Sequence, residues 1–421
     1  MSSQFTVLLG KAVRYAARLR GGGSALPGLF VEKIDPSFVP DTLAQLPKGV
    51  VIISGTNGKT TTTKMVVQLL ESQGLAVFTN RTGSNFVRGV AAALLGEVNA
   101  KGVLKADIAV LELDEAHAVK FVDIVAPRYS LLLNVMRDQL DRFGEIDSTA
   151  KMLEHIAKKT TDTVVANRED ERIVRFTQTL TTPVQYFGLA TPLLKEFPTD
   201  DELHGGVAQK SASPLPASVT LASYTENSAT YTVDQKELTT SLQLNGVYNI
   251  FNSAAALALV KAILPSAPTE TLITALSTVT PAFGRGETLT VNGAPLELML
   301  VKNPSGFRLG LSSFRPEGYA TMIAINDNYA DGRDMSWLWD VDFTSLQTAP
   351  VTVTGIRAYD MALRLDYDQV PIDFVDTSLS SALKKFISTN NATPKRIYCT
   401  YTAMLALRKE LATITEVEVV A

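Results

Sequence analysis

The fold of this chain is decided by the stretch from Val50 to Thr63, which reads VVIISGTNGKTTTT. Residues 50–53 are apolar and β-branched, and they predict a buried strand of a parallel sheet. Gly55 and Gly58 predict a tight turn, and the apolar residues that recur after Lys59 predict a helix. Such a turn directs backbone N–H groups at one point, next to the positive end of a helix. The stretch therefore predicts a phosphate-binding loop.

The loop is shorter than the general nucleotide-binding pattern, because two residues instead of four separate its glycines. In this arrangement we expect Lys59 to reach the terminal phosphates of a nucleotide and the Thr60 hydroxyl to lie on Mg²⁺. The expected nucleotide-binding set comprises Gly55, Thr56, Asn57, Gly58, Lys59, Thr60 and Thr61.

The composition is that of a globular protein, with 46% hydrophobic and 19% charged residues. At 421 residues the chain is too long for one ordinary core, so two or three domains are expected. The net charge of −4 argues against a nucleic-acid binder that works by bulk charge. No apolar run approaches the ~20 residues of a membrane span, and the N-terminus lacks a signal-peptide core, so we expect no transmembrane segment.

The single cysteine, Cys399, excludes an internal disulfide and a multi-cysteine zinc site, and this usage fits the reducing cytoplasm. Cys399 lies in a run that predicts a strand, and we interpret it as a packed small hydrophobe. A reactive thiol is the alternative. The three histidines show no metal-ligand spacing.

Beyond the loop, strands predicted at 76–79, 108–113, 129–135 and 163–166 alternate with helices. This alternation predicts an α/β fold with a doubly wound, mostly parallel sheet. Glu112 interrupts the apolar run 108–113, where an unpaired carboxylate would be costly. A cation would remove that cost, so Glu112 is the first candidate for the carboxylate on Mg²⁺. Asp114 and Glu115 are the second candidates.

Two further polar segments are candidates for the site, and the first of them is expected at the carboxyl edge of the sheet. The first is a candidate substrate loop with Asn80, Thr82, Gly83, Ser84 and Asn85, although an ordinary strand–helix connection is the alternative. The second is the pair Asn249 and Asn252, about one helical turn apart, before an alanine-rich helix predicted at 253–263. These two amides can contact an adenine edge or cap the helix.

Two further segments allow two interpretations each. Residues 326–343 hold both tryptophans and five aspartates, which suits a partner interface or a site rim, or a loop whose tryptophans pack on the core. The helix predicted at 5–19 carries Lys11, Arg14 and Arg18, followed by Arg20. We interpret its basic residues as a solvated face, with docking at an anionic lipid headgroup as the alternative.

Several motifs are similar, in sequence and in order, to those of the Mur ligases: GTNGKT at 55–60, ELDE at 112–115, Asn134 with Asp138, Asp141 and Gly144, YN at 248–249 with Asn252, and GR at 284–285. Finer matches resemble one branch, the MurT family, which supplies the synthetase subunit of lipid II isoglutaminyl synthases. These matches are RDQLDRFGE at 137–145, KNP at 302–304, ADG at 330–332, SWLWD at 336–340 and TYTAML at 400–405. The resemblance spans nearly the whole chain.

The resemblance implies a reaction and a domain plan. ATP phosphorylates the α-carboxylate of D-glutamate in the stem peptide of lipid II, and ammonia then gives D-isoglutamine. A partner glutaminase, GatD, releases the ammonia. The enzyme would be cytoplasmic and peripheral to the inner face of the membrane. Residues 1–47 would pack on a central ATP-binding domain at 48–284, with an insertion near 189–230, and a C-terminal domain at 285–421 would dock the partner.

The resemblance also implies site residues. Lys59, Mg²⁺ on Thr60 and Glu112, and Arg285 from the domain junction would stabilise phosphoryl transfer. Asn249 and Asn252 would contact adenine, and residues 80–85 the substrate. Glutamine hydrolysis needs a Cys nucleophile beside a His base, so with its one Cys in an apolar strand this chain needs a hydrolytic centre on another chain. Asp340 would complete the partner's Cys–His pair, with Asp342 as the second choice.

Departures from the family patterns leave alternatives open. Asp138-Gln139 replaces the Asp-His of single-chain Mur ligases, which puts a second metal in doubt, and no lysine near 151–159 matches their carbamylated lysine. The insertion lacks the Cys-x-x-Cys pairs that form a zinc ribbon in many MurT sequences, so no zinc is expected. The rival functions are a single-chain amino-acid ligase of Mur or folylpolyglutamate type and a non-catalytic nucleotide-binding scaffold.

Overall fold

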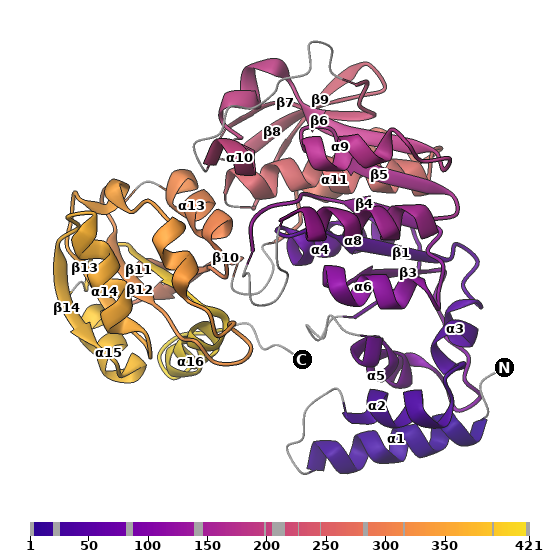
Figure 1. Cartoon of the computed structure of the whole chain (residues 1–421), viewed down its shortest axis with the longest axis horizontal. Helices are drawn as coiled ribbons and strands as arrows, with labels where there is room; N and C mark the ends of the chain where they lie inside the picture. Colours follow the sequence, from indigo (N-terminus) through magenta and orange to yellow (C-terminus); the bar gives the residue numbers. More distant parts are fainter. Residues whose placement is uncertain are drawn as a thin grey trace.

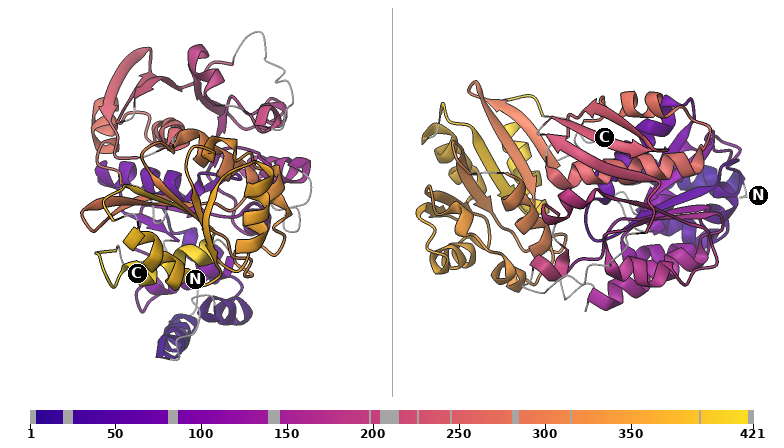
Figure 2. Two further views of the ribbon diagram at one scale, coloured as in Figure 1. Left: turned by 90° about the vertical axis from the view of Figure 1, so that its left-hand side faces the viewer. Right: turned by 90° about the horizontal axis from the view of Figure 1, so that it is seen from above.

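The computed structural model describes residues 4–19, 26–80, 87–138, 146–197, 199–203, 215–225, 227–244, 246–280, 285–314, 316–389 and 391–417. Within these ranges the chain folds into two bodies, each built on its own β-sheet (Figures 1 and 2). Among the described residues, no helix is both long enough and apolar enough to cross a bilayer.

The first sheet has nine strands in the order β2-β3-β1-β4-β5-β6-β7-β8-β9. Its strands are β1 (Val50–Ser54), β2 (Val77–Thr79), β3 (Ile108–Glu112), β4 (Tyr129–Leu132), β5 (Thr163–Asn167), β6 (Val184–Leu189), β7 (Val219–Thr225), β8 (Ser228–Val233) and β9 (Lys236–Ser241). The pairs from β2 to β7 are parallel, which confirms the predicted doubly wound sheet. The segment 189–230, for which an insertion is expected, contains β7 and the start of β8, and these strands continue the first sheet together with the following β9.

Helices cover both faces of the first sheet. They are α1 (Gln4–Leu19), α2 (Leu26–Ile34), α3 (Phe38–Leu43), α4 (Lys59–Ser72), α5 (Val87–Glu97), α6 (Glu115–Val122), α8 (Ile146–Lys159), α9 (Glu171–Thr177), η1 (Thr191–Lys195), α10 (Asp200–Leu203), α11 (Val247–Ile263) and α12 (Thr269–Leu276). One core lies between the sheet and α4, α11 and α12. The other includes Val7, Val31 and Phe38 of α1, α2 and α3, so the N-terminal helices share a core with the first sheet.

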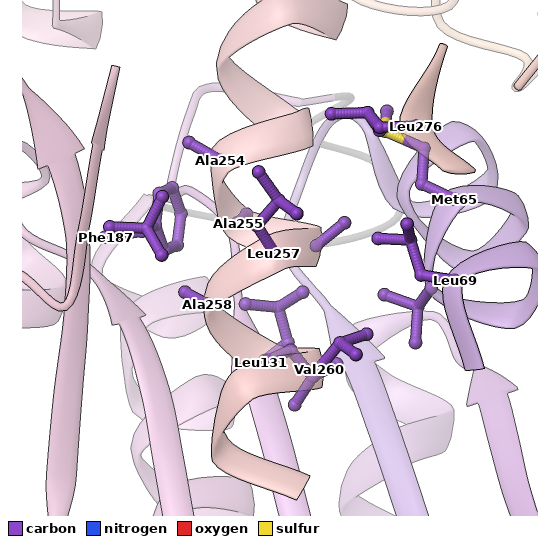
Figure 3. Packing of buried hydrophobic residues seen from close by; sticks show 14 of the residues in the cluster. Met65, Leu69, Leu131, Phe187, Ala254, Ala255, Leu257, Ala258, Val260 and Leu276 are labelled. Carbon is purple, nitrogen blue, oxygen red and sulfur yellow. The ribbon is translucent and has the colours of Figure 1, made fainter. Parts of the chain in front are cut away.

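Helix α11 forms the centre of the first core (Figure 3). Ala254 and Ala258 lie toward Phe187 of β6, while Val260 lies toward Leu69 of α4 (Figure 3). The short alanine side chains allow a close approach of helix and sheet, and long apolar side chains on the facing elements fill the remaining space. The helix begins at Val247, six residues before the predicted start, because Asn249 and Asn252 lie within its first turns instead of ahead of it.

The second sheet has six strands in the order β10-β11-β15-β12-β13-β14. Its elements are β10 (Arg285–Val291), β11 (Ala294–Leu300), α13 (Pro304–Ser313), β12 (Ala320–Ala324), η2 (Ser336–Asp340), η3 (Thr344–Leu346), β13 (Val351–Thr354), α14 (Ala358–Tyr367), β14 (Ile372–Asp376), α15 (Leu379–Thr389), β15 (Lys395–Cys399) and α16 (Tyr401–Leu411). Only β10 runs antiparallel to its neighbour. Cys399 is fully buried at the end of β15, and burial raises the pKa of its thiol, which agrees with a packed hydrophobe.

Two basic side chains of α1 contact the protein, whereas the sequence predicted a solvated face. Lys11 Nζ donates a hydrogen bond to the carbonyl oxygen of Val98, at 2.6 Å. The Arg14 guanidinium lies against Gly96, near the end of α5. Both side chains therefore approach the C-terminal end of α5, where unpaired carbonyl groups favour a cation. The side chains of Arg18 and Arg20 lie outside the described residues.

A glycine sets the distance between α2 and α5. A Cβ on Gly28 would lie 1.9 Å from the backbone oxygen of Arg88, which cannot move without displacing α5. We expect Gly28→Ala to lower the free energy of unfolding by about 1–3 kcal/mol through overpacking. The matched control is Gly310→Ala in α13, where the nearest atom would lie at an ordinary 3.4 Å. Urea denaturation of both variants checks this, and an unchanged midpoint for Gly28→Ala would contradict it.

Candidate active site

The loop between β1 and α4 has the backbone that the sequence predicts. Gly55 and Gly58 have φ angles of 136° and 90°, which side chains other than glycine rarely adopt. A Cβ on Gly58 would lie 2.3 Å from Nδ2 of Asn252, which comes from the first turns of α11. The loop is therefore pressed against α11, and glycine is required at position 58 for both reasons.

Lys59 is buried inside this loop. Its Nζ donates to the carbonyl oxygen of Gly55 at 2.6 Å and forms an ion pair with Oε2 of Glu115 at 3.4 Å. Burial opposes the charge of Lys59, but Glu115, Asp114 and other carboxylates outweigh it and raise the pKa of the lysine. Lys59 is therefore held as a cation at the loop.

The carboxyl group of Glu115 is buried together with Lys59, and its pKa is raised. Burial raises the pKa of Glu115 to about 7, although the Lys59 ammonium lowers it in part. Its second oxygen, Oε1, is buried and accepts no hydrogen bond within the described part of the chain. The sequence named Glu115 only as a second candidate for Mg²⁺, whereas the structure pairs it with the loop lysine.

Thr60 and Glu112 lie together, as the sequence predicts. The Thr60 hydroxyl donates to Oε1 of Glu112 at 2.7 Å. The other candidate, Asp114, accepts a hydrogen bond from the backbone N–H of Glu115 and caps α6. The described residues contain no group of three or more His, Cys, Asp or Glu side chains that could hold a metal. Mg²⁺ typically takes one or two protein oxygens together with substrate phosphates, so the adjacent oxygens of Thr60 and Glu112 could hold it.

Asn80 fixes the backbone of Glu112. Its Nδ2 donates to the carbonyl oxygen of Glu112 at 2.7 Å, and its Oδ1 accepts from the N–H of Glu112 at 3.0 Å. The amide thus joins the ends of β2 and β3, and it orients the carboxylate that approaches Thr60. The other members of the expected substrate loop, Thr82, Gly83, Ser84 and Asn85, lie outside the described residues, as does the side chain of Arg285.

Asn57 connects the loop to both domains. Asn134, just after β4, accepts from the N–H of Asn57 and donates to its carbonyl oxygen, each at 2.9 Å. Asn303 of the C-terminal domain donates to Oδ1 of Asn57 at 3.2 Å and caps α13 by accepting from Gly306 N–H at 2.7 Å. Sequence reasoning did not predict the Asn57–Asn303 contact, although the KNP motif at 302–304 was a signal.

Neighbouring contacts strengthen this junction between the domains. Lys302 Nζ forms an ion pair with Asp138 at 3.3 Å. Ser305 Oγ donates to Asp200 Oδ1 at 3.0 Å, and the same oxygen accepts from the N–H of Arg137 at 2.8 Å. The start of α13 therefore rests on the polypeptide that follows β4, directly beside the phosphate loop.

A hollow opens beside the loop, at the carboxyl ends of β4, β5 and β6. It is lined by Leu133, Asn134, Val135, Met136, Asn167, Glu169, Asp170, Glu171, Arg172, Leu189, Phe197, Thr199, Asp200, Asp201, Tyr248, Phe251 and Asn252. Asn252 belongs both to this lining and to the contact with Gly58. Asn249, its predicted companion, is not part of the lining.

The two tryptophans of the segment 326–343 follow different interpretations: one packs on the core, and the other is exposed as at an interface or site rim. Trp337 is buried against Phe307 in the core of the C-terminal domain. Trp339 is 49% exposed, and its ring meets the exposed ring of Tyr367 edge-on with 5.0 Å between centroids. One tryptophan therefore packs on the core, and the other lies at the surface.

Four of the five aspartates in this segment are engaged. Asp327 pairs with Arg357, Asp331 accepts from Thr402, Asp334 accepts from Ser336 N–H, and Asp342 accepts from the N–H and hydroxyl of Thr344. The carboxylate of Asp340 is exposed and has no partner within the described ranges, while its backbone oxygen accepts from Arg308 Nε. Asp340 thus differs from Asp342 in being available to a group outside the chain.

Comparison with solved structures identifies the class of protein. MurF from Acinetobacter baumannii aligns with a TM-score of 0.67 at 18% identity, over 90% of this chain and 80% of that one. MurF from Thermotoga maritima, solved in complex with ADP, aligns with a TM-score of 0.65 at 18% identity, over 89% of this chain and 83% of that one. The Mur ligase middle domain model matches residues 53–260. The fold is that of the Mur ligases.

Sequence comparison identifies the branch. The MurT subunit of the glutamine-hydrolysing lipid II isoglutaminyl synthase of Streptococcus pneumoniae is 31% identical over 96% of each chain. The corresponding subunit of Staphylococcus aureus is 29% identical over 88% of this chain and 90% of its own. The MurT ligase C-terminal model matches residues 300–404. The chain belongs to the MurT family, as its motifs indicated.

The buried carboxylate of Glu115 predicts a pH dependence of stability. The pKa of Glu115 lies near 7 in the folded chain and near 4.5 when unfolded, so the folded state binds the proton more tightly between these values. Stability therefore falls as the pH rises through this window. We expect wild type to lose stability relative to Glu115→Gln between pH 5 and pH 7, with a slope of up to about 1.4 kcal/mol per pH unit. Urea denaturation across this range measures it, and a constant difference would contradict it.

Proposed function

We propose that this chain is the ATP-dependent synthetase subunit of a lipid II isoglutaminyl synthase. It transfers the γ-phosphoryl group of ATP to the α-carboxylate of D-glutamate in the stem peptide of lipid II. Ammonia attacks the resulting acyl phosphate, phosphate leaves, and the product is D-isoglutamine. The names of the Streptococcus pneumoniae and Staphylococcus aureus relatives support this substrate, since the chain is similar to them over most of its length.

The observation that carries the proposal is the arrangement of Lys59, Thr60 and Glu112 at the loop. Phosphoryl transfer needs little covalent chemistry from the protein, and positioning with charge stabilisation provides most of the acceleration. Lys59 is a buried cation there, and Thr60 and Glu112 are adjacent oxygen donors. Mg²⁺ held by these two residues would neutralise charge on the phosphates. A non-catalytic scaffold would not need this set.

Three further groups complete the proposed site. Arg285, the first residue of β10, would bring a second cation from the domain junction to the transferred phosphoryl group. Asn252 and Asn249 would contact adenine. Asn252 lines the hollow beside the loop, which can receive the ring next to Tyr248 and Phe251, whereas Asn249 would reach it from outside the lining. Residues 80–85 would contact the stem peptide.

The ammonia must come from another chain. Glutamine hydrolysis by a class I glutaminase needs a thiolate nucleophile, and the single cysteine here is fully buried with a raised thiol pKa. We therefore propose a GatD-type glutaminase partner that binds the C-terminal domain. Asp340 would orient the partner's catalytic His, since its carboxylate is exposed and unengaged, and the exposed Trp339–Tyr367 pair beside it suits an interface.

The substrate determines where the enzyme works. Lipid II is anchored in the cytoplasmic membrane, and its sugar-peptide portion faces the cytoplasm before export. We therefore propose that the chain acts in the cytoplasm at the inner face of that membrane.

Removing the loop cation should stop the reaction with either nitrogen source. We expect Lys59→Ala to lower product formation at least about 100-fold with glutamine and with ammonium, because both need the acyl phosphate. Lys64→Ala is the matched control: it removes a lysine of the same helix whose Nζ bonds to Thr280, and it should retain activity. Mass spectrometry of lipid II incubated with ATP and the reconstituted pair measures product. Ammonium-dependent product at the wild-type rate in Lys59→Ala would refute the loop as the catalytic centre.

Removing the acid of Asp340 should separate the two nitrogen sources. We expect Asp340→Asn to reduce glutamine-dependent amidation by about 10³–10⁴-fold, as loss of the acid in a catalytic triad does. Amidation with ammonium should stay at the wild-type rate, because carboxylate activation is untouched. Asp342→Asn is the control, since Asp342 is engaged with Thr344 and should retain both activities. Loss of both activities, or of neither, in Asp340→Asn would rule out this role.

A further inference from the structure

Helix α1 presents an apolar face to the outside of the molecule. Phe5, Leu8 and Tyr15 are 68%, 57% and 68% exposed, and Ala12 between them is exposed as well. Since successive helical residues are 100° apart, these four positions fall within an arc of about 80°. Figure 1 shows α1 at the lower edge of the molecule, with α2 and then α5 above it, between α1 and the first sheet. The face is a continuous apolar stripe about 15 Å long, from the rise per residue.

The opposite side of α1 holds it in place. Val7 is fully buried in the core that α1 shares with the first sheet, and a Cβ on Gly10 would lie 2.8 Å from the side chain of Leu95 in α5. Lys11 and Arg14 approach the end of α5, as described above. The exposed stripe is therefore not the side of α1 that packs on the rest of the protein.

We propose that this stripe lies on a lipid bilayer, with Phe5, Leu8, Ala12 and Tyr15 inserted at the boundary between headgroups and acyl chains. The inference rests on the proposed function in one respect, namely that the substrate is anchored in a membrane. An interfacial helix combines an apolar face that carries aromatic residues with basic residues elsewhere.

The charge of α1 favours a bilayer over a protein partner. Helix α1 has Lys11, Arg14 and Arg18 and no acidic residue, so it has a net positive charge even though Lys11 and Arg14 contact the end of α5. A helix of net positive charge is attracted to an anionic leaflet. Helix α14 provides the contrast within the same chain. It also exposes large side chains, Tyr359, Leu363 and Tyr367, but it carries two acidic residues, Asp360 and Asp366, against one basic residue, Arg364, so its net charge is negative. An anionic surface would repel α14 and attract α1.

The position of α1 suits a lipid-linked substrate. Helix α5 begins at Val87, seven residues after Asn80, whose amide fixes Glu112 at the site. Its other end lies against α1 through the Lys11–Val98 contact. Eleven helical residues span about 16 Å. The described part of the chain thus places one end of α5 against the helix that carries the stripe, while its first residue is seven positions along the chain from the amide that fixes Glu112.

The test is flotation of the purified full chain with vesicles of phosphatidylcholine, with and without phosphatidylglycerol. We expect the wild type to float with the anionic vesicles and to remain bound at high salt, because insertion is apolar. The variant Phe5→Gln, Leu8→Gln, Tyr15→Gln should bind at least about tenfold more weakly, since Gln preserves helix propensity but removes the apolar face. The matched control, Tyr359→Gln, Leu363→Gln, Tyr367→Gln in α14, should float like the wild type.

Several results would overturn the inference. Equal flotation of the α1 variant and the wild type would do so, as would a wild type that binds no vesicle. Binding that disappears at high salt would indicate a purely electrostatic contact. If light scattering shows that the wild type is a dimer and the α1 variant a monomer, the stripe would be the contact with a second copy of the chain.

A second measurement separates this inference from the proposed function. With the partner present, the α1 variant should lose at least about fivefold in rate on lipid II embedded in vesicles. It should keep the wild-type rate on a water-soluble analogue with a shortened lipid. A wild type that floats but amidates neither substrate would refute the function and leave the membrane contact standing. A wild type that amidates both substrates but never floats would refute the membrane contact alone.

Discussion

The structure depends on the side chain and backbone of Asn57, which join three parts of the chain. Asn134 holds the backbone of this residue with two hydrogen bonds, and Asn303 reaches its side chain from the C-terminal domain. The phosphate loop is thereby fixed from the sheet edge and from the second domain at once. Because a loop that aims its N–H groups must not relax, this double support fixes the geometry on which phosphate binding relies. Because Asn303 belongs to the C-terminal domain, the same contacts also fix the position of that domain relative to the loop.

Two carboxylates three residues apart show how burial decides chemical role. Glu112 is the last residue of β3, and its oxygen lies beside the Thr60 hydroxyl, where a metal can share it. Glu115 is the first residue of α6 and is buried against Lys59, and its Oε1 has no hydrogen-bond partner among the residues that the structure describes. Glu112 is oriented for a ligand. Glu115 stabilises the buried Lys59 cation, and its own pKa is raised because it is buried as well. The sequence run ELDE contains both, but its spacing does not distinguish them.

The elements with strong local signals were predictable from sequence, and those set by long-range packing were not. Strand β1, the loop and α4 follow from one run of β-branched residues, two glycines and a helical pattern. The Asn57–Asn303 contact joins residues 246 positions apart, so it depends on how the domains meet. Strand β10 was not predicted, although Asn292 and Gly293 form the turn of its hairpin with φ angles of 52° and 78°. An Asn-Gly pair between two apolar runs is a local hairpin signal, so this strand belongs with the predictable elements.

The burial of Cys399 has a consequence for chemical dissection of the proposed assembly. An alkylating or oxidising reagent needs an accessible thiolate, and this chain offers none, because its only sulfhydryl is enclosed at the end of β15. Electrophiles that inactivate a glutaminase would therefore leave the phosphorylating half of the assembly intact. In the proposed assembly, the division of labour between two polypeptides would also divide the sensitivity to oxidation: peroxide would interrupt the supply of nitrogen, while this chain would continue to consume nucleotide.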